Sequence, residues 1–116
     1  MSALFESKCI PCRGGEPVLT SQEIAALKPL VPEYEVTDVA GILRLVRVYK
    51  FKNFAQALDF TRNVGEIAEA EDHHPALLTE WGKVTVSWWT HKIKGLHRND
   101  FIMAAKTDHL YPLKTE

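Results

Sequence analysis

Residues 42–51 read ILRLVRVYKF and residues 54–68 read FAQALDFTRNVGEIA, and these two neighbouring stretches decide the fold. The first stretch is rich in β-branched and aromatic residues and alternates with period two, so it predicts a β-strand. One face of that strand carries four apolar side chains, those of Leu43, Leu45, Tyr49 and Phe51. Arg47 interrupts this face, so we expect the strand to be half-exposed or to lie at an interface.

The second stretch predicts a long amphipathic helix. Asn53 is a good N-cap residue, and Gln56 stands at the third helical position as in a partial capping box. Six residues recur at steps of three and four and predict one buried stripe: Phe54, Ala57, Leu58, Thr61, Val64 and Ala68. Pro75 disfavours helical geometry at His74, so we expect the helix to end near that point.

Shorter elements flank these two. They are a helix capped by Thr20 and ended by Pro29 and Pro32, a strand at residues 34–36, strands at 77–81 and 83–89, and a final helix from Asn99. The order helix, strand, strand, helix, strand, strand, helix predicts an α+β fold, with a four-stranded antiparallel sheet and helices packed on one face. We expect residues 1–19 to be an irregular N-terminal arm and residues 20–116 to form a single domain.

Size and charge exclude several classes of function. The chain has 116 residues, of which 46% are hydrophobic and 25% charged, as in ordinary globular proteins. A net charge of −1 gives no global field that would attract nucleic acid or an acidic membrane. No apolar run approaches the ~20 residues that span a bilayer, and the first residues lack the pattern of a signal peptide. We therefore expect a cytoplasmic protein that binds neither nucleic acid nor membrane.

Cys9 and Cys12 form one C-x-x-C motif in a segment rich in glycine and proline. A zinc site would need two further ligands, and a thioredoxin-like motif would follow a strand and open a helix. Neither condition is met, so the sequence predicts no metal site here. A metal shared between subunits and a redox-sensitive arm remain as alternatives.

Ionisable side chains gather where the long helix ends. The run Glu69-Ala-Glu-Asp-His73-His74-Pro75 is followed by Trp81, His91 and Asp100. Histidine gives and takes protons near neutral pH, so three histidines with acidic neighbours indicate an acid–base site. Each residue taken singly also fits a structural role, because histidine suits a helix C-terminus and aspartate suits a first helical turn.

The set as a whole resembles the signature of the pterin-4a-carbinolamine dehydratases. The resemblance extends to Phe51-Lys-Asn-Phe-Ala, to Lys83-Val-Thr-Val, to Thr90-His91 and to the cysteine-containing arm, so it covers nearly the whole chain. It implies a four-stranded antiparallel sheet and assembly into homodimers or homotetramers. It also implies dehydration of a 4a-hydroxytetrahydropterin to the quinonoid dihydropterin, with no cofactor. The substrate is a product of aromatic amino acid hydroxylases, which are therefore possible pathway partners.

The same resemblance implies roles for nine residues. The catalytic set is His73, His74, His91 and Asp100, and the substrate-binding set is Glu69, Asp72, Pro75, Trp81 and Thr90. Within the catalytic set we favour His74 and His91 for proton transfer and His73 for binding and orientation of the pterin. Asp100 would fix the orientation of a histidine.

A second hypothesis is a non-catalytic binding, assembly or transcriptional coactivator module on the same fold. Scaffold-type relatives tend to lose the histidine set, and this chain retains all three histidines. The sequence therefore favours the enzyme.

Overall fold

The computed structural model describes residues 4–11 and 14–111. Its centre is one four-stranded antiparallel sheet in the order β1-β2-β4-β3. The strands are β1 (Glu35–Val39), β2 (Ile42–Lys50), β3 (Ala76–Glu80) and β4 (Lys83–Trp88). Leu45 pairs with Trp88 across β2 and β4, and Leu77 pairs with Val86 across β3 and β4. The predicted pair of hairpins is confirmed, and the second strands of both hairpins lie side by side in the middle of the sheet.

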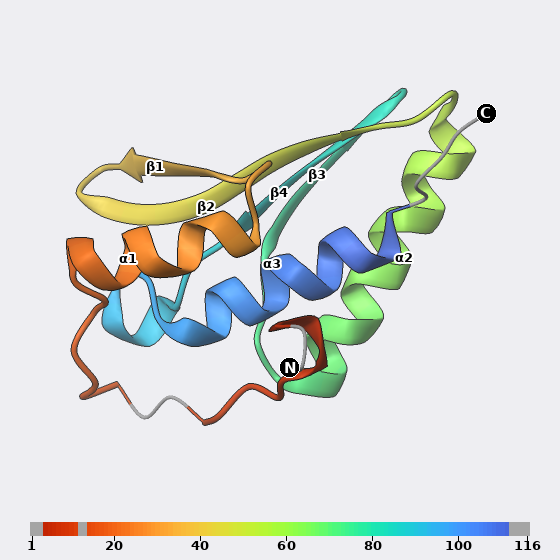
Figure 1. Ribbon diagram of the computed structural model, residues 1–116. Coiled ribbons are helices and arrows are strands. Elements are labelled where there is room, and N and C mark those ends of the chain that lie inside the picture. Colours follow the sequence, from red (N-terminus) through yellow and green to blue (C-terminus); the bar gives the residue numbers. More distant parts are fainter. Residues whose placement is uncertain (1–3, 12–13, 112–116) are drawn as a thin grey trace.

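Three α-helices lie on the same side of this sheet (Figure 1). They are α1 (Ser21–Leu27), α2 (Phe54–Glu71) and α3 (Arg98–Leu110). The described residues also form short 3₁₀ helices, η1 (Leu4–Glu6), η2 (Lys28–Leu30) and η3 (His91–Ile93). The predicted α+β order of helices and strands is therefore confirmed. None of the described helices is both long and apolar enough to cross a membrane.

The predicted helix starts rest on side-chain caps. Thr20 and Glu23 form a complete capping box at the start of α1. The Asn53 side chain accepts a hydrogen bond from the Gln56 amide at the start of α2. His97 caps α3, where its Nδ1 accepts from the Asn99 amide at 3.0 Å. These caps satisfy backbone N–H groups that have no partner within the helix.

The buried face of α2 is rotated from the predicted stripe. Ala57, Phe60, Val64 and Ala68 are the buried residues of this helix. Phe54 and Leu58 were expected in the stripe but are 44% and 51% exposed. The prediction was wrong at these two positions because α2 is apolar on two adjacent rows, and periodicity alone does not say which row faces the sheet.

Arg47 interrupts the apolar face of β2 because it bridges that strand to α3. Its guanidinium donates to Asp108 at 2.7 Å and lies 4.4 Å from the centre of the Tyr49 ring. The Tyr49 hydroxyl donates to the same carboxylate at 2.6 Å and lies 2.7 Å from the Tyr34 hydroxyl. Burial raises the pKa of Tyr34 and of Tyr49, so both stay neutral. We expected β2 to be half-exposed or at an interface where Arg47 interrupts its apolar face. In the structure Arg47 is instead partly buried and paired with Asp108.

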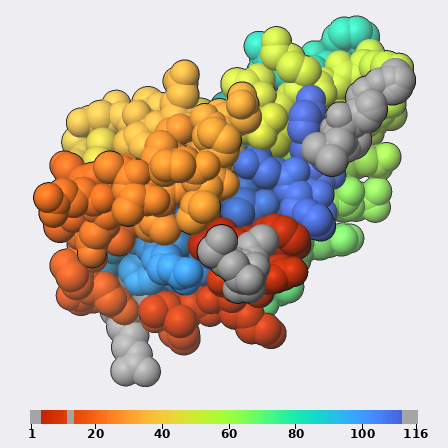
Figure 2. Space-filling view, viewed as in Figure 1, coloured from red at the N-terminus to blue at the C-terminus, as the bar shows by residue number. Residues whose placement is uncertain are grey.

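The N-terminal arm packs along α3 instead of extending into solvent. The Phe5 carbonyl accepts from the Lys106 ammonium at 2.7 Å. In the space-filling view the red arm residues lie directly against the blue surface of α3 (Figure 2). The arm contains one short regular element, η1, and the second cysteine, Cys12, lies outside the described residues.

Candidate active site

The end of α2 separates the two adjacent histidines. Asp72 follows the last helical residue in the left-handed conformation, with φ 53° and ψ 43°. The His73 amide donates to the Ala68 carbonyl at 3.1 Å, which closes the helix end in the manner of a Schellman motif. The chain then leaves the helix extended, so successive side chains point to opposite sides. His73 is 9% exposed, whereas the side chain of His74 is 50% exposed.

His73 belongs to a buried polar cluster with Asp100 at its centre. The His73 Nε2 lies 2.6 Å from Asp100 Oδ1. The other carboxylate oxygen accepts from the Thr90 hydroxyl at 2.7 Å and from the His97 amide at 2.9 Å. Asp100 is 0% exposed, so these groups satisfy a carboxylate that water does not reach. The predicted proximity of His73, Thr90 and Asp100 is therefore present in the structure.

Packing fixes the plane of the His73 ring. The ring is nearly parallel to that of Trp88, with an angle of 9° and centroids 5.9 Å apart. The Trp88 indole N–H donates to Thr107 at 3.2 Å, and Trp88 is fully buried. Trp88 was assigned to a strand face from the sequence, and its contact with His73 was missed.

His74 pairs with Glu69 on the outside of the molecule. Its Nε2 lies 2.5 Å from Glu69 Oε2, and the Glu69 side chain is 79% exposed. Glu69 lies in the last turn of α2, so this helix supplies the carboxylate that pairs with His74. The sequence analysis assigned Glu69 to substrate binding and did not predict its contact with His74; solvent reaches both side chains.

His91 starts η3 and lies against a second tryptophan. Its ring stacks on Trp89 with centroids 4.4 Å apart, and the Arg44 guanidinium lies 3.8 Å from the centre of the Trp89 ring. The ladder between β3 and β4 pairs Ala76 with Ser87. This is the last pair of the ladder at that end, so His74 lies two residues before β3 and Trp89 directly follows β4. Neither Trp89 nor Arg44 was among the predicted site residues, although the Trp88-Trp89 pair directly before Thr90-His91 was the available signal.

The remaining predicted residues lie at different distances from this cluster. Pro75 directly follows His74 and is half-buried, and Asp72 precedes His73 with an exposed side chain. Trp81 is 73% exposed at the turn that joins β3 to β4. The five residues of β3 separate it from Pro75, so the two lie six steps apart, about 20 Å at 3.3 Å per residue. One protomer alone does not bring Trp81 to the histidines, and its contact with a pterin stays a prediction.

Neither a nucleophilic thiol nor a metal cluster accompanies the histidines in the described part of the chain. Burial, together with the charge of Glu71, raises the pKa of Cys9 from its usual 9.0 to about 12, so this thiol stays protonated at neutral pH. Among residues 4–11 and 14–111, no three or more His, Cys, Asp or Glu side chains are grouped as a metal ion would require.

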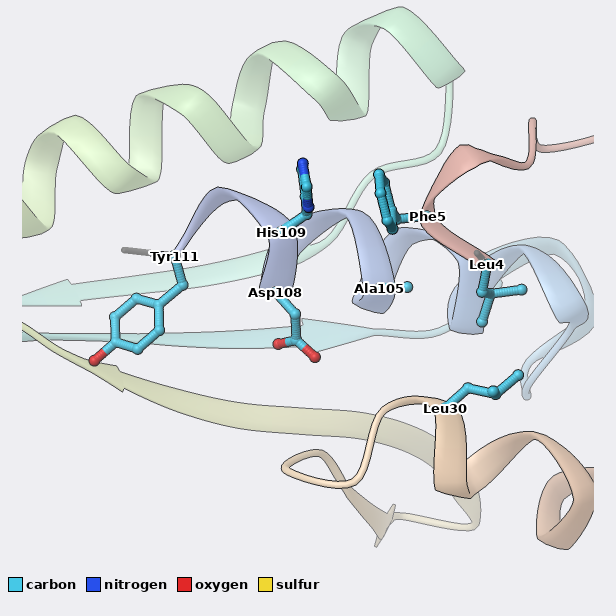
Figure 3. A pocket seen from close by; sticks show the side chains of 7 residues that line it. All are labelled: Leu4, Phe5, Leu30, Ala105, Asp108, His109 and Tyr111. Carbon is cyan, nitrogen blue, oxygen red and sulfur yellow. The ribbon is translucent and has the colours of Figure 1, made fainter. Parts of the chain in front are cut away.

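A separate pocket of about 430 Å³ lies at the other end of α3 (Figure 3). Its walls are Leu4, Phe5, Leu30, Ala105, Asp108, His109 and Tyr111. None of the predicted site residues lines it. In the close-up, the Asp108 carboxylate and the Tyr111 ring lie toward β2, while Phe5 and His109 stack beside each other.

An α+β fold in which histidines and carboxylates converge on the end of one helix defines a class of small acid–base enzyme, and comparison with known proteins specifies the family. The model of the pterin 4 alpha carbinolamine dehydratase family matches residues 17–110. The chain belongs to this family.

Relatives from two bacteria are similar over almost the whole chain. A protein of Syntrophotalea carbinolica is 56% identical over 110 residues, which cover 95% of this chain and 98% of the relative. A protein of Microcystis aeruginosa is 56% identical over 111 residues, which cover 96% of each. Both are named "Putative pterin-4-alpha-carbinolamine dehydratase". A crystal structure described as a transcriptional coactivator/pterin dehydratase from Brucella melitensis has a TM-score of 0.74 and 28% identity, and the alignment covers 83% of this chain and all of that one.

Proposed function

We propose that this protein is a hydro-lyase that dehydrates 4a-hydroxytetrahydropterins to quinonoid dihydropterins, as its family membership indicates. The proposal is carried by one structural observation: His73, His74 and His91 gather around the ends of α2 and β4, each with its own supporting partner. In the reaction, a lone pair of the neighbouring ring nitrogen forms a C=N bond as the C4a–O bond breaks. The departing oxygen takes a proton and leaves as water, while the ring nitrogen gives one up.

His74 and His91 are the proposed proton donor and acceptor. Both are exposed, so a substrate could reach their ring nitrogens. Glu69 holds one nitrogen of His74, which fixes the direction of the other. The stack on Trp89 restricts the ring of His91 in the same way. Positioned acid–base groups of this kind typically contribute about 10²–10⁴ in rate.

His73 is the proposed binding residue, because Asp100 commits its Nε2 within the protein. The remaining ring nitrogen, Nδ1, is available for a fixed hydrogen bond to the pterin. Thr90 donates its hydroxyl proton to Asp100, so toward a ligand it acts only as an acceptor. Asp100 is proposed as a positioning residue, since it is fully buried and its two oxygens bind His73, Thr90 and the His97 amide.

The carboxylates of Glu69 and Asp72 are proposed to accept from N–H groups of the pterin ring. Both side chains are exposed and lie shortly before the histidine pair in sequence. Pro75 supplies apolar surface beside His74. Assembly into homodimers or homotetramers and a link to an aromatic amino acid hydroxylase are further proposals that rest on the family resemblance. A cytoplasmic location is proposed from the sequence pattern alone.

The test is the decay of a freshly generated 4a-hydroxytetrahydropterin with and without the purified chain. We expect the protein to accelerate the decay, and a chelator to leave the rate unchanged, because proton transfer alone suffices for this chemistry. A protein that binds the pterin without accelerating its decay would favour the binding-module hypothesis. Loss of activity on chelation, with recovery on adding zinc, would contradict the metal-free mechanism.

A further inference from the structure

Residues Cys9 and Ile10 of the N-terminal arm lie across the ends of two helices and are called the strap below. The Cys9 amide donates to Glu71 Oε1 at 2.8 Å, at the last residue of α2. The Ile10 amide donates to Asn99 Oδ1 at 3.0 Å, and the Asn99 side-chain amide donates back to the Ile10 carbonyl at 2.7 Å. The Cys9 thiol adds a longer contact to the Asn99 carbonyl at 3.8 Å.

The two residues that the strap joins are sequence neighbours of the buried pair. Asn99 directly precedes Asp100, and Glu71 lies two residues before His73. Asn99 is 2% exposed, so its side chain exchanges hydrogen bonds with the strap away from water. Only the single left-handed residue Asp72 separates Glu71 from His73, so fixing Glu71 restricts where His73 can lie.

We infer that the strap is a positioning element of the active site, which holds the end of α2 against the start of α3 and thereby sets the geometry of His73 and Asp100. Three of its four contacts use backbone atoms of the arm. The strap therefore depends on the course of the chain and not on the identity of its side chains. The proposed effect on catalysis rests on the role given to His73 under the proposed function.

Variants at residue 9 separate the backbone contact from the side chain. Cys9→Pro removes the N–H that Glu71 accepts, whereas Cys9→Ser keeps it and is the matched control. At the other end of the same bond, Glu71→Ala removes the acceptor, and Glu71→Gln retains an oxygen at that place. Asn99→Ala removes both bonds to Ile10 and tests the second half of the strap.

We expect Cys9→Pro, Glu71→Ala and Asn99→Ala to raise the Michaelis constant for the pterin about threefold to tenfold, the range to which one net hydrogen bond corresponds. Turnover should change less than the Michaelis constant, because His73 is the binding residue. Cys9→Ser and Glu71→Gln should behave like the original chain. In protein labelled with ¹⁵N-histidine, the ring signals of His73 should shift in the first three variants, while those of His74 stay in place.

Two results would overturn the inference. One is an unchanged Michaelis constant and unchanged His73 signals in Cys9→Pro and Glu71→Ala. The other is a uniform loss of active protein, with lower turnover, the original Michaelis constant and unshifted His73 signals, which would show that the strap only stabilises the fold. Shifted His73 signals without a kinetic effect, together with an inert His73→Ala, would uphold the strap as a positioning element and contradict instead the role proposed for His73.

Discussion

Replacement of Asp100 by asparagine is the perturbation whose effect the structure defines most closely. Asparagine has the shape of aspartate, and its one oxygen can still accept from Thr90 and His97, which share a single carboxylate oxygen in the structure. The amide nitrogen must then take the place of Oδ1, opposite His73 Nε2. An N–H in that place cannot accept from His73, so the ring must present a lone pair there and carry its proton on Nδ1.

The expected cost follows from the loss of the carboxylate's charge, since the buried groups around it no longer bind a charged acceptor. A buried hydrogen bond to a charged group is worth about 1.5–3 kcal/mol, so we expect Asp100→Asn to lower the free energy of unfolding by about 2 kcal/mol. For a domain of this size that corresponds to a fall in Tm of about 8 °C. With its proton on Nδ1, His73 presents the pterin with a hydrogen-bond donor instead of an acceptor, so the Michaelis constant for the pterin should rise.

Thermal unfolding followed by circular dichroism measures this cost, and Asp59→Asn is the matched control. Asp59 pairs with Arg62 at 2.8 Å on the surface of α2, where the two side chains are 68% and 62% exposed. Exposed pairs of this kind contribute about 0–1 kcal/mol, so this control should melt close to the original chain. If Asp100→Asn melted within about 2 °C of the original protein, the assignment of Asp100 as the organising centre of the buried cluster would be refuted.

Three further outcomes are expected. Asp72→Asn should leave Tm unchanged, because asparagine tolerates the left-handed conformation. It should raise the Michaelis constant for the pterin if the carboxylate binds the substrate, and a Michaelis constant equal to that of the original chain would remove Asp72 from the binding set. Trp89→Leu should lower turnover about threefold to tenfold by freeing the ring of His91, and unchanged turnover would contradict that support. In a Cys12→Ser background, Cys9 should react with iodoacetamide at pH 8 about 10³-fold more slowly in the folded than in the unfolded chain, since its raised pKa leaves little thiolate. The same shift favours the protonated thiol in the folded state, so its contribution to stability is present below about pH 9 and is lost as the pH rises toward 12.

Local signals in the sequence were sufficient for the elements and their order. The caps at Thr20 and Asn53 and the alternation along β2 are short-range features, and each appears in the structure as expected. The rotation of α2 was not predictable in the same way. Phe54 and Phe60 are equally apolar, and only the position of the sheet decides which of them is buried.

The site shows the same division between near and distant residues. Glu69 and His74 are only five residues apart, on either side of the helix end, whereas the contact between His73 and Asp100 spans 27 residues and came from the family resemblance. The predicted site did not include Trp88, Trp89 or Asn99. A place in a strand is enough to explain the two tryptophans, and a place at a helix start is enough to explain the asparagine. What they contact depends on how β4, α3 and the arm pack together, which no local pattern encodes.

The central claim is that the histidines perform the proton transfers, and turnover of the 4a-hydroxytetrahydropterin by single and double histidine variants tests it most directly. His74→Ala and His91→Ala should each lower turnover by about 10²–10⁴ with little change in Tm. The double variant should lose far less than the product of the two effects, because groups that act together are not additive. His109→Gln, at the far end of α3, serves as the control and should retain full turnover. Near-original rates in both single variants would contradict the account and leave the three histidines as a structural feature of a helix end and a strand end.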